Sequence, residues 1–228
     1  MRLGLKGMPA AAESICVGRD IEVAALTGGR LHIAHLSTAA SLEHVRTAKR
    51  RGIAVTCEVT PHHFTLIDEN VEYDSRYKMN PPLGSREDRA ALLDGLADGT
   101  VDAIATDHAP HHPASKDVEF DRAPFGILGF ETAIGLALRE LVHANRIPLM
   151  HMLELFTTGP ARVLAKQNEA GKLAEGCAAD VTIFSLHREW TYRVEESPSR
   201  SRNSPFDGQK FKGGPVAAIV AGKIAYRA

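Results

Sequence analysis

Residues able to bind a metal ion gather at the ends of short apolar stretches. The clearest case is Val101–Pro113, a run of small and β-branched residues that ends in Asp107 and three histidines. His35 follows a shorter apolar stretch in the same way. A single histidine at a strand end is more often a hydrogen-bonded structural residue than a ligand. Because histidine and aspartate recur at the ends of neighbouring stretches, the pattern instead indicates a divalent metal site, for zinc above all.

These apolar stretches alternate with segments of helical periodicity. The predicted strands are 30–36, 53–59 and the stretch that begins at 101, and the predicted helices are 8–27, 37–51, 85–98 and 130–145, with shorter helices starting at Pro148 and Pro160. Such alternation predicts an α/β fold with a parallel sheet and right-handed crossovers. Chemistry in these folds lies at the carboxyl ends of the strands, which is where the polar residues occur.

The side-chain alternation of a strand predicts which residues share a face. It places Ile33 with His35, and Ala103 and Ala105 with Asp107. In a barrel these would be interior faces, with His35 and Asp107 in the top layer. The small alanines would leave room above them for a metal ion.

Composition excludes several classes of protein. The 228 residues are 44% hydrophobic and 24% charged, enough for a globular core, and the net charge of −1 without a basic run disfavours nucleic-acid or acidic-membrane binding. The three cysteines are widely spaced and match no CxxC pattern, which argues against a disulfide framework or a thiolate zinc site. No apolar stretch approaches membrane-spanning length. A cytoplasmic protein is expected.

Five short motifs follow one another along the chain. They are HIAHLS at 32–37, EVTPHH at 58–63, KMNPPL at 78–83, TDHAPH at 106–111 and APFG at 123–126. In order and spacing they resemble the motifs of bacterial-type dihydroorotases, which are cyclic amidases of the amidohydrolase superfamily. Segments 171–181 and 203–208 are similar to the superfamily's return to a small β-sandwich and to its C-terminal end. The resemblance covers nearly the whole chain.

The resemblance implies part of a TIM-like (β/α)8 metal-dependent hydrolase barrel followed by a segment of a small β-sandwich. The three predicted strands correspond to the sixth, seventh and eighth of the barrel, so the chain is expected to be the C-terminal portion of a dihydroorotase. Residues 1–168 would belong to the barrel and 169–228 to the return segment. Further metal ligands, including a His-x-His pair, would lie in the missing N-terminal half. We therefore expect the chain alone to be inactive and to need that half.

The resemblance also implies roles for individual residues. His35 corresponds to a zinc ligand, and Asp107 corresponds to a ligand that also serves as acid and base. Substrate contacts would come from Asn80, His111, Phe125 and Gly126. His62 and His63 correspond to no ligand, and burial or hydrogen bonding is expected for both.

The implied reaction is the reversible, zinc-dependent interconversion of N-carbamoyl-L-aspartate and (S)-dihydroorotate in pyrimidine biosynthesis. A hydantoinase or allantoinase would keep the fold and change the ring, but the matches at Asn80, His111 and Phe125 favour dihydroorotate. A third interpretation is a non-catalytic dihydroorotase-like partner of aspartate transcarbamoylase. Such chains typically lose metal ligands, whereas His35 and Asp107 are both present. A homo-oligomer is compatible with each interpretation.

Overall fold

The first half of the chain builds a parallel sheet flanked by helices. A computed structural model describes residues 3–228, so residues 1 and 2 of the predicted barrel segment lie outside the described residues. In chain order the elements are α1 (Ala10–Thr27), β1 (Leu31–Ile33), α2 (Ala39–Arg50), β2 (Val55–Val59), 3-10 turns η1 (Asp68–Asn70) and η2 (Ser75–Tyr77), α3 (Arg86–Ala97) and β3 (Ala103–Ile104). The strands pair in the order β1-β2-β3, all parallel. The predicted α/β arrangement is confirmed.

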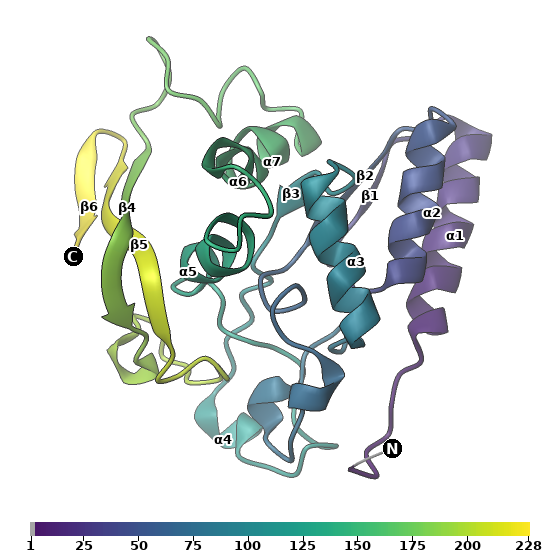
Figure 1. The fold of residues 1–228 in the computed structure, drawn as a ribbon, viewed down its shortest axis with the longest axis horizontal. Helices are drawn as coiled ribbons and strands as arrows, with labels where there is room; N and C mark the ends of the chain where they lie inside the picture. Colours follow the sequence, from purple (N-terminus) through teal and green to yellow (C-terminus); the bar gives the residue numbers. More distant parts are fainter. Residues whose placement is uncertain (1–2) are drawn as a thin grey trace.

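Side-chain caps fix where the helices begin. Thr38 accepts a hydrogen bond from the Ser41 amide at the start of α2, and Ser85 and Asp88 form a capping box at the start of α3. Glu13 on α1 accepts the Thr38 backbone N–H at 3.1 Å, which ties α1 to the first turn of α2. Figure 1 shows α1 and α2 side by side along one flank of the molecule.

The apolar core lies between the sheet and the helices that cover it. Leu42 and Val45 of α2 are at most 1% exposed, and Leu92 and Leu96 of α3 are fully buried against the same core. Each leucine buried in this way contributes about 1.5–3 kcal/mol. The core holds the strands at fixed positions, and with them the residues that follow each strand.

The strands are shorter than predicted. Segment 30–36 is a strand only over Leu31–Ile33, and the stretch from Val101 only over Ala103–Ile104. Among the described residues β1 and β3 each pair with one neighbouring strand only, β2, so each has hydrogen-bonding partners on one edge. The shorter strands follow from this limited pairing. The chain then leaves the extended conformation at His35 and Asp107, with φ of 55° and 46°. The predicted alternation of faces therefore ends before either residue.

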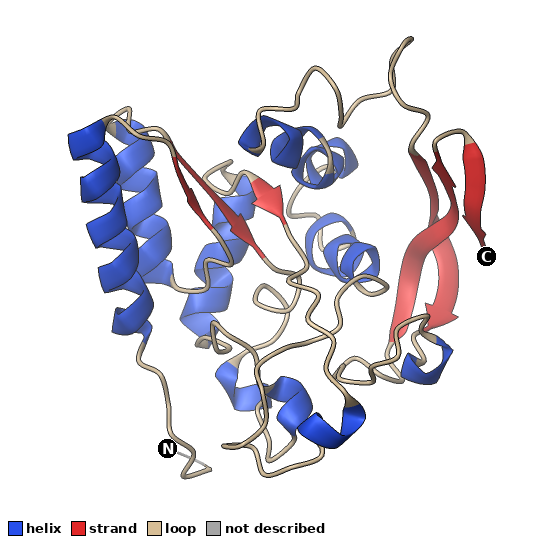
Figure 2. Cartoon of the chain, turned by 180° about the vertical axis from the view of Figure 1, so that it is seen from behind, coloured by secondary structure: helices blue, strands red, loops and turns tan. Residues whose placement is uncertain are grey.

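The second half is mainly helical before it turns into a second sheet. It contains α4 (Pro113–Lys116), α5 (Ala133–Ala137), the π-helical turn η3 (Leu138–Val142), α6 (Leu149–Phe156), α7 (Thr158–Val163), β4 (Val181–Thr191), the 3-10 turn η4 (Val194–Glu196), β5 (Lys210–Val220) and β6 (Lys223–Arg227). The helix predicted over 130–145 is thus shorter and changes its winding. Figure 2 shows the two sheets lying apart, with helices between them.

The antiparallel sheet β4-β5-β6 packs against the helical layer. A side-chain atom at Gly135 of α5 would lie 2.8 Å from the Phe211 ring of β5, so the glycine permits this close approach. Phe211 shares a buried cluster with Leu136 and Tyr192. One apolar cluster therefore joins residues on both sides of the predicted boundary at 168, and that boundary stays a prediction. No helix among residues 3–228 is long and apolar enough to cross a bilayer.

Candidate metal and substrate site

The structure brings His35 and Asp107 together beyond the ends of β1 and β3. His35 Nε2 lies 3.6 Å from Asp107 Oδ1, and the two side chains are 30% and 29% exposed. Both donor atoms therefore face one small, solvent-accessible space. This separation suits two ligands of one metal ion, whose bonds to nitrogen and oxygen are each roughly 2 Å long.

Both residues adopt a backbone conformation that side chains other than glycine rarely take. The positive φ values of His35 and Asp107 place them in the left-handed region, at a cost of roughly 1–2 kcal/mol per ordinary residue. Strain of this kind is often retained at functional sites. Here it turns two side chains from separate strands toward each other.

Glu58 is the site residue that the sequence interpretation assigned no role. It lies on β2, with Oε1 2.7 Å from His35 Nδ1 and Oε2 3.5 Å from His32 Nε2. The His35 contact is an ion pair that is not aligned as a hydrogen bond. Burial alone would raise the pKa of Glu58, but the two histidines lower it to about 2. A glutamate near the carboxyl end of the buried strand 53–59 was the sequence signal that could have revealed it.

Electrostatics differ between the two facing side chains. Glu58 raises the pKa of His35 above its ordinary value, against the opposing effect of burial. Burial raises the pKa of Asp107, and the nearby Glu58 adds to the effect while His35 opposes it. Glu58 at His35 Nδ1 leaves Nε2 as the nitrogen directed toward Asp107. A carboxylate on the far nitrogen of an imidazole is the usual support for a metal-binding histidine.

Asn80 lies on an exposed loop that a buried histidine anchors. His63 contacts Thr60 Oγ1 through Nδ1 at 2.7 Å and the Pro81 carbonyl through Nε2 at 2.9 Å. Burial lowers the pKa of His63 to about 4, so the ring is neutral near pH 7. His62 is 2% exposed and its Nε2 has no hydrogen-bond partner. The expected burial of both histidines is observed, and His63 supports the Asn80 loop.

His111, Phe125 and Gly126 meet in the loops that follow β3. His111 Nε2 lies 2.7 Å from the Phe125 carbonyl, and Phe125 itself is 46% exposed. A Cβ at Gly126, whose φ is 147°, would lie 2.8 Å from both the Ala109 carbonyl and the His111 ring. Only glycine fits this contact without strain.

Asn203, far away in the sequence, holds the His111 loop. Its Nδ2 donates to the Ala109 carbonyl at 2.9 Å, and its Oδ1 accepts from the His111 amide at 3.3 Å. Asn203 is 3% exposed. Sequence reasoning placed it in a C-terminal motif without a role, because no local pattern reveals a contact across some 90 residues.

A cavity of about 580 Å³ runs between α1, β1 and the loop that carries Asn80. Its lining includes His32 and Ile33 of β1 and Glu13 and Cys16 of α1, but neither His35 nor Asp107. The cavity therefore follows the unpaired side of β1, and of the predicted site residues it contains Asn80 alone.

The chain contributes a partial set of metal donors. No group of three or more His, Cys, Asp or Glu side chains that could hold a metal occurs within residues 3–228. His35 Nε2 and Asp107 Oδ1 offer one nitrogen and one oxygen, which suit zinc in type but are fewer than the three protein ligands of a catalytic zinc site. The residues fit a metal whose remaining ligands come from elsewhere.

Comparison with known proteins identifies a consistent set of relatives. Residues 10–225 match the amidohydrolase family. The chain is 52% identical over 227 residues to the dihydroorotase of Solibacter usitatus (strain Ellin6076), covering 99% of this chain and 52% of that protein. It is 50% identical over 228 residues to the dihydroorotase of Endomicrobium trichonymphae, covering 100% of this chain and 54% of that protein. The chain thus spans about half the length of the curated relatives it matches.

Solved structures show the same fold. The L-hydantoinase (dihydropyrimidinase) of Arthrobacter aurescens superposes with a TM-score of 0.91 at 27% identity, covering 96% of this chain and 50% of that one. The D-hydantoinase of Thermus sp. superposes with a TM-score of 0.89 at 26% identity, covering 96% and 49%. The α/β arrangement described above is therefore shared with two hydantoinases of about twice its length.

Proposed function

The chain belongs to the amidohydrolase family, and we propose that it is the C-terminal part of a dihydroorotase. The reaction would be the reversible, metal-dependent interconversion of N-carbamoyl-L-aspartate and (S)-dihydroorotate. The observation that carries the proposal is the facing pair His35 and Asp107, with Glu58 on the far side of the His35 ring. The chain that contains this pair is 52% identical in sequence to a dihydroorotase.

His35 Nε2 and an Asp107 oxygen would hold the metal, for which we propose zinc. Zinc supplies Lewis acidity that polarises the ring amide carbonyl and activates water. Glu58 would keep the His35 ring oriented toward the metal. Asp107, beside the space where water enters, would accept the proton of the attacking water and pass it to the ring nitrogen as the amide C–N bond breaks.

The substrate would be held by the loop that carries Asn80 and the loops that carry His111, Phe125 and Gly126. We propose that the Asn80 amide and the His111 ring donate hydrogen bonds to the substrate carboxylate and ring. The backbone at Phe125 and Gly126 would contact the ring edge, since the absence of a side chain at Gly126 lets the main chain come close. His111 would exchange its present Phe125 contact for one to substrate.

The proposal includes a second half of the barrel. A three-stranded parallel sheet leaves two unpaired edges in the described residues, and a cavity is lined in part by β1. We propose that the missing N-terminal barrel half supplies a further strand and the remaining metal ligands. Inactivity of the isolated chain, a cytoplasmic location, and association with a second copy or with aspartate transcarbamoylase remain parts of the proposal.

A hydantoinase or another cyclic amidase is the second candidate, because the two solved structures compared above are hydantoinases. Dihydroorotate, hydantoin and allantoin should be compared as substrates of the assembly that contains this chain. We expect dihydroorotate to have by far the highest kcat/KM. Preference for hydantoin would instead support the second candidate.

Replacement of Asp107 tests the proposed mechanism. In the active assembly, Asp107→Asn and Asp107→Ala should lower kcat at least about 100-fold, in line with the usual contribution of a positioned acid or base. Asp94→Asn, on the exposed face of α3, is the matched control and should leave kcat unchanged. Near-normal turnover by both Asp107 variants would contradict the proposal.

A further inference from the structure

We propose that Lys116 is a positioning residue whose hydrogen bonds join the two segments proposed to contact the substrate. One segment presents Asn80 and the other presents Phe125 and Gly126. The inference rests on the proposed function, since it takes these residues as substrate contacts. It adds a residue to which neither the motifs nor the comparisons gave a role.

Hydrogen bonds from a single buried amine join the two segments. Lys116 ends α4 and is 7% exposed. Its Nζ donates to the Pro124 carbonyl at 2.9 Å and to the Lys78 carbonyl at 3.3 Å. Pro124 immediately precedes Phe125, and Lys78 stands two positions before Asn80. The amine therefore connects the backbones that carry the proposed contacts.

The same junction contains a direct backbone bond. The Gly126 amide donates to the Lys78 carbonyl at 2.9 Å, so this carbonyl accepts from both Gly126 and Lys116. This bond fixes the position of the Gly126 amide relative to the Lys78 carbonyl. Lys116 thus stabilises the register between the Asn80 loop and the Gly126 loop.

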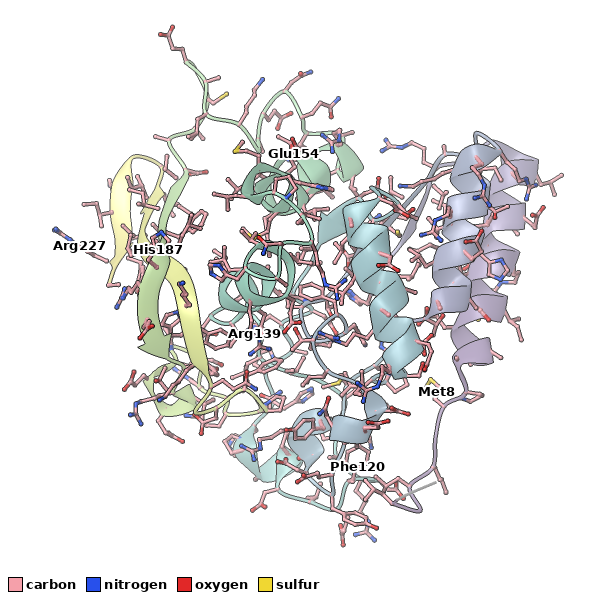
Figure 3. The ribbon with its side chains drawn as sticks, in the orientation of Figure 1. Met8, Phe120, Arg139, Glu154, His187 and Arg227 are labelled. Atoms are coloured by element: carbon pink, nitrogen blue, oxygen red, sulfur yellow. The ribbon has the colours of Figure 1, made fainter. Side chains whose placement is uncertain are left out.

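The Lys78 side chain binds the beginning of the loop 120–126. Lys78 Nζ donates to the Phe120 carbonyl at 2.8 Å and to the Asp121 carbonyl at 2.9 Å. It also lies 5.0 Å from the centroid of the Phe125 ring. Figure 3 labels Phe120 among the loops at the lower edge of the view. The two lysines together fasten residues 120–126 to the Asn80 segment.

The cost of burying Lys116 supports a role beyond packing. Within residues 3–228 no carboxylate lies within ion-pair distance of its Nζ, and the amine is bound only by carbonyl groups. Burial and the nearby Lys78 lower the pKa of Lys116 to about 8, with Asp74 opposing them. Because an apolar side chain of similar length would avoid this desolvation cost, the amine is better explained by the carbonyls it joins.

The position of α4 is itself fixed at the same place. The Ser75 hydroxyl, 6% exposed, donates to the Lys116 carbonyl. Ser75 lies in η2, directly before Lys78 and Asn80. The segment 75–78 therefore binds Lys116 twice. Ser75 binds the Lys116 backbone carbonyl, and the Lys78 carbonyl accepts a hydrogen bond from the Lys116 side chain, which also binds Pro124.

The test compares Lys116→Met with Lys49→Met in the assembly that carries the activity. Lys49 is a suitable control because its Nζ also donates to a backbone carbonyl, that of Thr100, and pairs with Asp102 away from these loops. For Lys116→Met we expect the KM for dihydroorotate to rise about tenfold or more, with kcat changed less than threefold. Lys49→Met should lower the melting temperature without changing KM.

A second measurement does not depend on turnover. Hydrogen–deuterium exchange of the peptide that contains the Gly126 amide should be at least about tenfold faster in Lys116→Met and unchanged in Lys49→Met. If the wild-type assembly fails to hydrolyse dihydroorotate, the proposed function is wrong while the exchange result still decides the role of Lys116. Unchanged exchange, or a KM within twofold of wild type, would overturn the proposal. Should Lys116→Met not fold, Lys116→Gln takes its place, and unchanged exchange of the same peptide in that variant would overturn the proposal.

Discussion

At the scale of residues, the site combines side chains that are individually unfavourable where they stand. His35 and Asp107 occupy left-handed backbone positions, and burial raises the pKa of Asp107, which means that its charged form is disfavoured. Neither feature stabilises the fold. Both features are explained if the backbone leaves the strand conformation at His35 and Asp107 so that the two side chains can bind a common ligand.

We therefore expect Asp107→Gly to raise the free energy of unfolding by about 1 kcal/mol while removing activity. Glycine relieves the left-handed strain, and loss of the carboxylate removes a partly buried charge. Ala165→Gly is the matched control, because Ala165 is exposed and has a similar φ of 56°. Urea unfolding of the three proteins measures the effect. A clearly destabilised Asp107→Gly, beside a stabilised Ala165→Gly, would show that Asp107 holds the fold rather than straining it.

At the scale of elements, the sequence predicted what local chemistry determines. The predicted helix starts at 37 and 85 lie within two residues of the observed starts of α2 and α3, because caps such as Thr38 and Ser85 are made within a few residues. Strand lengths were overestimated, since a ladder depends on distant partners and not on the apolar run alone. For the same reason the sequence did not reveal Lys116 or Asn203, whose bonds join separate loops.

The cap of α3 also connects two helices, and this gives a prediction. Asp88 Oδ2 accepts the Ser85 amide, while Oδ1 accepts the Ala39 amide of α2 at 2.8 Å. Ser85→Ala should cost about 1 kcal/mol of stability, as loss of a cap usually does. Asp88→Ala should cost more than Ser85→Ala, by about 1–2 kcal/mol, because it also leaves the Ala39 amide without its acceptor. Thermal unfolding measures both, and equal costs would mean that the link to α2 contributes nothing.

At the scale of the whole molecule, the described residues form only part of a metal and substrate site. The structure brings His35 to Asp107 and His111 to Gly126, while the roles that the motifs imply for these residues stay predictions. No third metal donor joins His35 and Asp107 in the described residues. Both edges of the parallel sheet lack a partner strand there, and the cavity follows one of them. The metal site needs further ligands and the sheet needs a further strand. A second half of the barrel would supply both.

The final prediction concerns metal retention. The isolated chain, dialysed against zinc-free buffer, should retain well below one zinc per chain and show no dihydroorotase activity, since two protein donors hold zinc weakly. Addition of an N-terminal barrel half from a dihydroorotase should restore both retention and activity, because it would supply further ligands and a strand along β1. Asp107→Asn in the same mixture should assemble normally but lower zinc retention. Stoichiometric zinc and normal turnover in the chain alone would show instead that residues 1–228 complete the site among themselves.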